Sequence, residues 1–253
     1  MRKLPPLQKT NRGWARPASR NYPLVPLEEP GSSAVLRQQQ ILDDHVLTME
    51  LAGGEVGYVR RSSLIYAGGD FDMRTRRIAS KAVPILGIFS GQNLWANRFE
   101  ATSPTSLVAG RDYHGTVLGM EVTEGEAVWL QPALYLGHRG DLEFTVKRVA
   151  RREFWTLTRV TGEGTVWIKA PGRSFRKPLD PETPVVVDTN YVAAVRGDFA
   201  ADGRVFSRGQ YLRSGEAENV KIRGMGDVLI QTEVPITAAG GGGPLGYLLD
   251  LFI

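Results

Sequence analysis

The side chains best suited to metal or acid–base chemistry in this sequence are its three histidines, His45, His114 and His138. A cupin-type metal centre needs a His-x-His pair that converges on one ion with a carboxylate and a further histidine. The three histidines lie far apart in the chain, and none has that spacing. We predict that His138 is an exposed residue of a turn ending at Asp141 and that His114 lies in a loop. The pattern predicts no metal site.

Nucleophilic catalysis has equally little support. The chain contains no cysteine, which excludes disulfides, thiolate metal ligands and a cysteine nucleophile. It also lacks the Gly-x-Ser-x-Gly motif that presents a catalytic serine. The carboxylate pairs Glu28-Glu29 and Asp43-Asp44 are adjacent in sequence, and adjacent residues of a strand point to opposite faces. We therefore predict no enzyme activity, no catalytic residue and no cofactor.

Two glycine-rich phrases, Gly162-Glu-Gly164 and Gly224-Met-Gly226, are candidates for a phosphate-binding loop. A dinucleotide-binding fingerprint places its phosphates at the N-terminus of a helix. Both phrases instead precede runs in which apolar and polar residues alternate, a pattern typical of strands. We interpret Gly162, Gly164, Gly224 and Gly226 as tight turns between strands.

A group of basic and aromatic residues is the best candidate for a nucleic-acid interface. Single-stranded RNA is held by aromatic side chains that stack on bases and by cations that follow the phosphates. The stretch from 147 to 155 combines both types, and its candidate RNA contacts are Arg148, Arg151, Arg152 and Trp155. Further candidates elsewhere in the chain are Arg74, Arg76, Arg77, Arg98 and Trp95.

The distribution of charge weakens the case for RNA. The whole chain carries 31 basic and 27 acidic residues. Residues 1–40 contain seven of the basic and two of the acidic residues, a net charge of +5, which leaves a net charge of −1 for the rest. A body close to neutrality has no long-range positive field to attract a polyanion. We therefore rank RNA binding behind solvated surface charges and core aromatics.

The two ends of the chain differ from its middle. Residues 1–40 are basic and rich in proline, and we expect a flexible arm. Residues 234–253 combine a glycine-rich linker, Gly240–Gly243, with an apolar tail, Tyr247–Ile253. The tail is too short to span a bilayer, so no transmembrane helix is predicted. We expect it to dock on its own body, on a neighbouring subunit or on a membrane surface, in that order.

Residues 41–233 consist of short alternating runs bounded by glycine, proline and aspartate, which predict an all-β body. Within it, residues 51–71, 122–142 and 179–199 align without a gap, and we interpret them as three copies of one repeat. The three copies share the pairs Gly69-Asp70, Gly140-Asp141 and Gly197-Asp198. Because glycine accepts positive φ and aspartate binds nearby backbone amides, we predict three equivalent turns. The alternation also places Trp129 and Trp167 in the core.

Four stretches resemble the altered inheritance of mitochondria protein 24 family over about residues 41–233. They are Gly125–Leu130 (GEAVWL), Gly162–Lys169 (GEGTVWIK), Val185–Ala193 (VVVDTNYVA) and Arg223–Thr232 (RGMGDVLIQT). The last stretch is the most specific. The sequence departs from the family pattern at Gly91-Gln92, where members usually have Gly-Glu, and at Met225, where they usually have proline.

The resemblance implies a fold similar to that of the tryptophan RNA-binding attenuation protein, with three double-stranded β-helix units per chain. It also implies assembly into trimers with a ring-like plan. The family has no established enzymatic activity, and its fungal members have a role in the organisation of the mitochondrial inner membrane.

We therefore predict an all-β chain of three repeated double-stranded β-helix units that forms a homotrimer, because exposed sheet edges tend to be paired or covered. The predicted function is that of a non-enzymatic scaffold or binding protein of the cytoplasm, with an unidentified protein partner. The alternative is a ring that binds single-stranded RNA. A cupin-like metalloenzyme is the least favoured reading.

Overall fold

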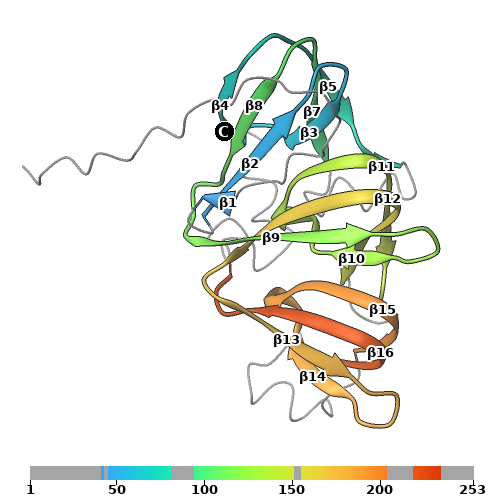
Figure 1. The fold of residues 1–253 in the computed structure, drawn as a ribbon. Coiled ribbons are helices and arrows are strands. Elements are labelled where there is room, and N and C mark those ends of the chain that lie inside the picture. The colour runs from blue at the N-terminus through green and yellow to red at the C-terminus, as the bar shows by residue number, and fades with distance from the viewer. Residues whose placement is uncertain (1–40, 43–44, 81–93, 151–154, 204–218, 235–253) are drawn as a thin grey trace, which may run out of the picture. The chain divides into compact units, whose positions relative to one another are not determined.

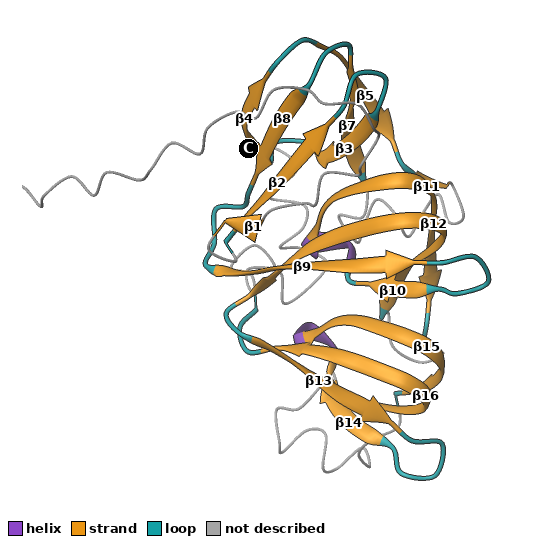
Figure 2. Ribbon diagram, viewed as in Figure 1, coloured by secondary structure: helices purple, strands orange, loops and turns teal. Residues whose placement is uncertain are grey.

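The computed structural model describes residues 41–42, 45–80, 94–150, 155–203 and 219–234. Within these ranges the chain forms β-strands joined by loops and two short 3₁₀ turns (Figure 2). The prediction of an all-β protein is therefore confirmed. The predicted arm (residues 1–40), the apolar tail (Tyr247–Ile253) and two candidate RNA contacts (Arg151 and Arg152) lie outside the described residues.

Residues 46–109, which we call the N-terminal segment, form two layers of antiparallel strands (Figure 1). One layer has the strand order β1-β2-β8-β4, and the other contains β3-β7-β5. The bounds are β1 (Ile41–Leu42), β2 (Val46–Leu51), β3 (Val56–Arg60), β4 (Leu64–Gly68), β5 (Phe71–Arg77), β6 (Ala79–Ser80), β7 (Trp95–Ala101) and β8 (Thr105–Ala109). β8 buries alternate residues, as its Thr-Ser-Leu-Val-Ala sequence requires of a strand between core and surface.

Residues 115–171, the middle segment, are organised around one long strand. The elements are β9 (Gly115–Val122), β10 (Val128–Leu130), the 3₁₀ turn η1 (Pro132–Leu134), β11 (Tyr135–Arg148) and β12 (Thr156–Pro171). β12 pairs antiparallel with β9, β10 and β11. β11 and β12 together make a long hairpin whose pairing extends from Tyr135 to Arg148.

Residues 174–231, the C-terminal segment, repeat the same order of elements. They are β13 (Ser174–Leu179), β14 (Val185–Asp188), the 3₁₀ turn η2 (Thr189–Tyr191), β15 (Val192–Asp202) and β16 (Asn219–Gln231). β16 pairs with β13, β14 and β15, as β12 does with β9, β10 and β11. β14, η2 and β15 each begin 57 residues after β10, η1 and β11, at the offset of the sequence alignment.

The N-terminal segment has the same pairings with shorter strands. β4 and β5 take the places of the two halves of β11, and β7 and β8 take those of β12. A shift in register that marks a β-bulge falls at one aligned position in all three segments, next to Ile65, Leu136 and Ala193. An irregularity that recurs at aligned positions indicates that the backbone follows a related path in each segment.

The Gly-Asp pairs do not all lie in turns. Gly69 and Asp70 lie in the connection between β4 and β5. Gly140-Asp141 lies inside β11 and Gly197-Asp198 inside β15, which corrects the prediction of equivalent turns at these two places. The glycines predicted as tight turns before strands are also inside strands, namely Gly162 and Gly164 in β12 and Gly224 and Gly226 in β16.

Facing glycines explain this outcome. Gly140 faces Gly164 in the β11–β12 pair, and Gly197 faces Gly226 in the β15–β16 pair. Gly140 has a φ of +95°, and a Cβ atom there would clash with the carbonyl oxygen of Glu163. Because only glycine combines this backbone conformation with such a close approach, the two paired strands can bend together without ending. In sequence, such a bend resembles a turn.

Two strand pairings join consecutive segments. We call the β3–β11 pairing the first seam and the β10–β15 pairing the second seam. At the first seam Gly137, His138 and Arg139 face Val59, Tyr58 and Gly57. At the second seam Ala194, Val195 and Arg196 face Leu130, Trp129 and Val128. At each seam, the first half of a long strand therefore extends the sheet of the preceding segment.

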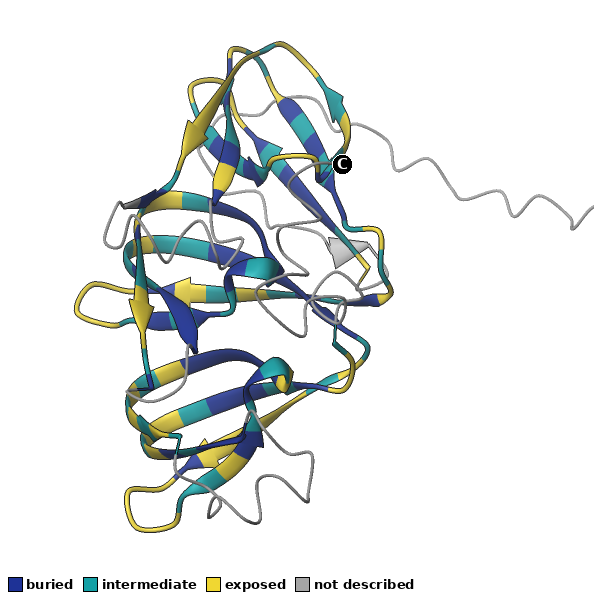
Figure 3. Cartoon of the chain, turned by 180° about the vertical axis from the view of Figure 1, so that it is seen from behind, coloured by how far each residue is buried: buried dark blue, intermediate teal, exposed yellow. Residues whose placement is uncertain are grey.

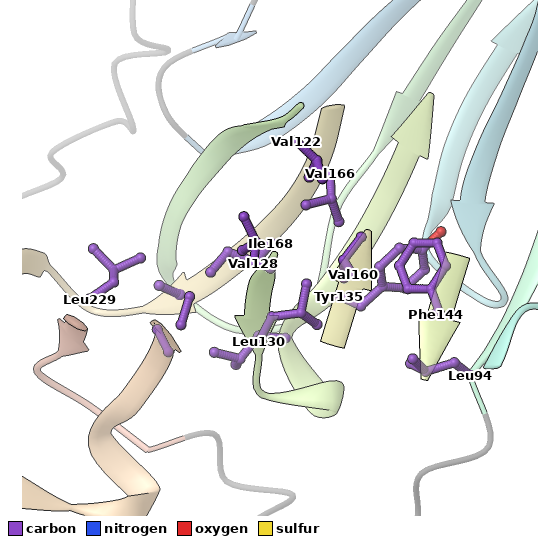
Figure 4. Close-up of a cluster of buried hydrophobic side chains, with 14 of the residues drawn as sticks. Leu94, Val122, Val128, Leu130, Tyr135, Phe144, Val160, Val166, Ile168 and Leu229 are labelled. Carbon is purple, nitrogen blue, oxygen red and sulfur yellow. The ribbon is translucent and has the colours of Figure 1, made fainter. Parts of the chain in front are cut away.

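Buried apolar side chains fill the space between the strand layers, and Figure 3 shows how burial alternates along the strands. In the middle segment, Val122, Val128 and Ile168 belong to one cluster that also includes Leu229 of β16 (Figure 4). This cluster thus continues across the second seam. Trp167 is buried, which confirms its predicted place in the core, whereas Trp129 is only half-buried.

Candidate functional site

The predicted RNA contacts do not form a surface for base stacking. Trp155 is 8% exposed and belongs to the core of the C-terminal segment, which corrects its prediction as an RNA contact. The guanidinium of Arg148 donates its Nε–H to the carbonyl of Ala150 at 3.1 Å. With Arg151 and Arg152 outside the described residues, no stacking platform is seen in the described part of this stretch.

Two of the other arginines that were candidate RNA contacts form ion pairs with carboxylates. Arg74 forms an ion pair with Asp72 at 3.0 Å, and Arg98 forms one with Glu100 at 2.6 Å. The hydrogen bond to Glu100 raises the pKa of Arg98. These carboxylates offset part of the positive charge that would otherwise attract a phosphate backbone. Trp95 is exposed on β7.

Trp129 lies among cations on a half-buried face of β10. The Lys147 ammonium lies 6.0 Å and the Arg159 guanidinium 5.9 Å from the centroid of its ring. Phe199 contacts the same ring edge to face, with centroids 5.5 Å apart. Cation–π contacts of this kind stabilise a partly exposed aromatic ring. The sequence predicts only that Trp129 lies in the core, whereas the structure leaves its ring half-buried beside Lys147 and Arg159.

His138 is buried, so the prediction of an exposed turn residue is wrong. Its Nδ1 shares a 2.6 Å hydrogen bond with the hydroxyl of Tyr135. Its ring stacks on Tyr58 with centroids 4.2 Å apart and contacts Phe144 at 4.7 Å. Burial lowers the pKa of His138 to about 3, so the ring is neutral at physiological pH. The side chain acts as a packed aromatic group of the first seam.

The other two histidines lie in separate places. His45 Nδ1 is 2.9 Å from the carbonyl oxygen of Gly115, and His114 is exposed in the loop before β9. Within the described ranges, no three His, Asp or Glu side chains are close enough together to hold a metal ion. The described side chains therefore provide no candidate metal centre.

Arg60 fixes the first seam through carbonyl groups. Its Nη1 donates to the carbonyl oxygens of Pro132 at 3.1 Å, Ala133 at 3.2 Å and Tyr135 at 3.5 Å. Burial, with a smaller effect from the positive charge of Arg111, lowers the pKa of Arg60 to about 10. The guanidinium remains charged at neutral pH and ties the end of β3 to η1 of the next segment.

Lys169 and Tyr113 form a second group of inward polar side chains. The Lys169 ammonium donates to the carbonyl of Arg111 at 3.1 Å, and the Tyr113 hydroxyl donates to the carbonyl of Lys169 at 2.7 Å. Burial lowers the pKa of Lys169 and raises that of Tyr113 to about 12. Since both groups bind main-chain carbonyls, their positions are explained by the fold.

Two strand edges at the ends of the segment series are the candidate functional surface. β4 pairs with β8 on one side, and β14 pairs with β16 on one side. Neither has a partner on its other side within the described part of the chain. Ile65 and Tyr66 of β4 are 63% and 57% exposed, and Val186 of β14 is 49% exposed. We call these surfaces the β4 edge and the β14 edge.

The aligned residues inside the body are buried. Ile65 corresponds to Leu136 and Ala193, and both of these are 0% exposed. Tyr191, which follows β14 in η2, is 37% exposed, while its aligned residue Leu134 is fully buried. Ile65 and Tyr191 therefore occupy positions that are covered wherever a further segment is present, whereas Val186 aligns with Tyr58 and Trp129, which stay half-buried at the seams.

The family of the protein follows from its sequence over most of this body. The family model described as mitochondrial biogenesis AIM24 matches residues 39–233. The chain belongs to this family. The match covers all three segments and both edges. Comparison with curated proteins gives no match.

A solved structure has a similar fold. The chain resembles the crystal structure of protein SPYM3_0169 from Streptococcus pyogenes with a TM-score of 0.63 and 16% sequence identity. The similarity covers 85% of this AIM24 family chain and 98% of the other. At this identity, the comparison supports the architecture of the body. No helix in the described ranges has the length and apolar character of a membrane span.

Sequence reasoning missed the functional interest of the two edges, although the repeat alignment contained the signal. It aligned Ile65 with Leu136 and Tyr191 with Leu134, that is, with positions of the core. The alignment alone could not show which copies are covered, because that depends on strand order. His138 was missed because the local sequence His-Arg-Gly-Asp is typical of an exposed turn.

Proposed function

We propose that this member of the AIM24 family is a non-enzymatic scaffold protein that acts as a homotrimer in the cytoplasm and binds a further, unidentified protein. The family is associated with mitochondrial biogenesis. The assembled chains would present a β surface to this partner.

We also propose that the three segments are three double-stranded β-helix units like those of the tryptophan RNA-binding attenuation protein. The recurring order of strands and the bulge at aligned positions support this reading. Such units are joined in a row by their seams, so a row of three has two free ends.

The observation that carries the proposal is the exposure of apolar side chains on the β4 and β14 edges. Open edges with exposed apolar residues tend to be paired or covered in native proteins, since they otherwise promote aggregation. Closed cyclic assembly covers edges without leaving new ones. Self-association therefore accounts for features that a working monomer would leave exposed.

Light scattering of the purified full-length chain tests the assembly. The expected mass is three times the 27.8 kDa of one chain at micromolar concentration. A mass of one chain under these conditions contradicts the proposal. Metal analysis of the same sample tests the non-enzymatic reading against a cupin-like enzyme, because stoichiometric iron, manganese or zinc would require that reading to be reversed.

Single-stranded RNA binding is the second candidate, and the cations around Trp129 are the observation in its favour. Fluorescence anisotropy with a labelled RNA of mixed sequence, at low and high salt, decides between the two. The scaffold proposal predicts no binding that survives deletion of the basic residues 1–40. Salt-dependent binding by the shortened chain, abolished by Trp129→Ala, would favour the RNA ring.

A further inference from the structure

We propose that Arg60, Arg111 and Lys169 form a binding site for a terminal phosphate group at the first seam. The site lies where the end of β3, the loop that leads into β9 and the last part of β12 meet. It is contained in one chain, so it is independent of the proposed homotrimer. It would give the scaffold a small anionic ligand.

Main-chain contacts bring the three cations together. The amide of Gly110 donates to the carbonyl of Ser63 at 2.8 Å, which places the loop before β9 beside the turn that follows Arg60. The Lys169 ammonium donates to the carbonyl of Arg111, in the same loop, at 3.1 Å. The three side chains come from elements far apart in the sequence, so local patterns do not show them as a group.

The ring of Tyr113 holds two of the cations. The guanidinium carbon of Arg111 and the ammonium of Lys169 each lie 5.5 Å from its centroid. The Tyr113 hydroxyl donates to the carbonyl of Lys169 at 2.7 Å, which fixes the ring against β12. Lys169 is 4% exposed, while Arg60, Arg111 and Tyr113 are half-buried. The cations are therefore held in place before a ligand arrives, which reduces the entropy that binding costs.

The charges of this group are not balanced. None of the three cations forms an ion pair within the described ranges. Burial, and then the positive charge of Arg111, lower the pKa of both Arg60 and Lys169. The exposed Asp112 raises the pKa of Lys169, so it offsets one of the three charges and leaves a net charge of +2. Because a charge that is buried without a partner is costly, this group requires an anion.

The second seam has no such charges. The position aligned with Arg60 is Gln131, and the position aligned with Lys169 is Gln231. Both residues are neutral, although the strand pairing at the two seams is the same. The shared architecture therefore accounts for the places of Arg60 and Lys169 but not for their charge.

A neutral amide is also enough for a hydrogen bond that Arg60 makes to η1. At the first seam Arg60 donates to the carbonyl of Ala133 at 3.2 Å. At the second seam the aligned carbonyl, that of Asn190, accepts from Nε2 of Gln231 at 2.9 Å. The positive charges of the first seam are therefore additional to what a seam needs in order to form.

The donor groups select the class of ligand. Guanidinium groups bind phosphate oxygens with two parallel hydrogen bonds, and a lysine ammonium adds a compact charge. Arg60 uses Nη1 for carbonyl groups, and no hydrogen bond of the Arg111 guanidinium is seen within the described ranges. A terminal phosphate carries close to two negative charges at neutral pH, which matches the net charge of the site. A carboxylate or a phosphate diester carries one and would leave part of the positive charge unpaired.

Calorimetric titration of the full-length chain with inorganic phosphate tests the site. One phosphate should bind per chain, and the melting temperature should be higher in phosphate than in chloride at equal ionic strength. Arg111→Gln and Lys169→Gln should each weaken binding about tenfold or more, the loss expected for one charge-assisted hydrogen bond. Lys169→Gln introduces the residue type found at the second seam, so it should fold.

Arg159→Gln is the matched control. Arg159 is also half-buried, and its guanidinium lies 5.9 Å from the centroid of an aromatic ring, that of Trp129. This variant should bind phosphate as the wild type does. Circular dichroism in chloride, without phosphate, should show that all three variants are folded.

Vesicles of phosphatidylcholine, with and without phosphatidic acid, show whether the phosphate belongs to a lipid. Flotation with the phosphatidic acid vesicles that is lost in Arg111→Gln identifies a lipid headgroup as the source. Binding of inorganic phosphate without flotation identifies a soluble phosphate or phosphate ester. Both results support the site.

Two results would overturn the proposal. Equal phosphate affinities of the wild type, Arg111→Gln and Lys169→Gln would place the binding elsewhere in the chain, for example on the basic residues 1–40. No binding of phosphate to the wild type at millimolar concentration would remove the site altogether. Neither result bears on the homotrimer, which the mass measured by light scattering tests separately.

Discussion

The two seams have the same backbone pairing but different side chains. At the first seam the His138 ring stacks on Tyr58, whereas at the second seam Val195 faces Trp129. Both seams have an ion pair at aligned positions. In the first it joins Arg139 to Glu55 at 3.8 Å, and in the second it joins Arg196 to Glu126 at 2.8 Å.

The two seams differ even more at the C-terminal end of their short strands, β3 and β10. Arg60 donates to three carbonyl groups at the first seam. Gln131, at the aligned position of the second seam, has a buried Oε1 atom for which the described structure provides no hydrogen-bond partner. The register of the seams therefore follows from features that both seams share, which are the backbone pairing and the β-bulge next to Leu136 and Ala193. Side-chain chemistry adjusts the strength of each seam.

The largest expected effect on stability comes from Gly140 and Gly197, which face Gly164 and Gly226 inside the two long strand pairs. Gly140→Ala and Gly197→Ala should each lower the free energy of unfolding by about 3 kcal/mol, since a positive φ costs an L-residue ~1–2 kcal/mol and overpacking adds ~1–3 kcal/mol. Their φ values are +95° and +93°, and both Cβ atoms would clash with backbone. Urea denaturation measures the loss.

Gly125→Ala is the control for this comparison. Gly125 has a φ of +83°, but a Cβ atom there would have no neighbour within 4 Å. Its cost should be the conformational part alone, about 1–2 kcal/mol. Equal losses in the free energy of unfolding for Gly125→Ala and Gly140→Ala would show that the close approach of β12 to Gly140 adds no further cost.

Arg60 should matter more to stability than its aligned residue. Arg60→Met should lower the free energy of unfolding by about 2–3 kcal/mol, because it leaves half-buried carbonyl groups without a charged donor. Gln131→Met should be nearly neutral, since it removes a buried polar atom that has no hydrogen-bond partner. Chemical denaturation of both variants measures the difference. A larger loss for Gln131→Met would reverse the proposed roles of these residues.

The first seam should also be sensitive to acid. The pKa of His138 is about 3 in the folded chain and near its ordinary value of 6.5 in the unfolded chain. Between these values the unfolded state binds more protons, so stability is fully present above pH 6.5 and falls as the pH falls. The expected loss attributable to His138 is about 1.4 kcal/mol between pH 8 and pH 5.5.

His138→Asn isolates this contribution. Asparagine can retain a hydrogen bond with the Tyr135 hydroxyl but does not titrate. Thermal denaturation at a series of pH values should show a flatter dependence for the variant than for the wild type below pH 6.5. Parallel curves would mean that the buried ring is not the source of the acid sensitivity.

The smallest effect is expected for the ion pairs. Hydrogen bonding from Arg196 lowers the pKa of Glu126, so its contribution to stability is present above the ordinary pKa and is lost as the pH falls through the lowered value. Glu126→Gln should lower the melting temperature slightly at pH 7, and the difference from wild type should disappear in acid. Glu55→Gln, at the longer pair, should have a smaller effect still. A larger effect for Glu55→Gln than for Glu126→Gln would show that the N–O distances of the two ion pairs do not reflect their contributions to stability.

The sequence predicted the strand content and the aligned positions of the three segments well, because hydrophobic alternation is visible locally and the three copies align without a gap. The alignment at an offset of 57 placed Val185 on Val128 and matched the starts of β14 and β10. It misread Gly140-Asp141, since a bend within paired strands and a turn between strands need the same positive φ. The burial of His138 and Trp155 and the exposure of Ile65 depend on contacts between distant strands, which local patterns do not contain.

The seams also constrain the order in which the chain can be completed during synthesis. β3 acquires its outer neighbour only when β11 has been made, after β4 to β10 have emerged, and β10 likewise waits for β15. A growing chain therefore always carries one strand whose outer side is still unpaired, and that strand moves along the chain as each segment folds. Shielding of this temporary edge, by a chaperone or by rapid elongation, would decide how much newly made protein escapes misassembly.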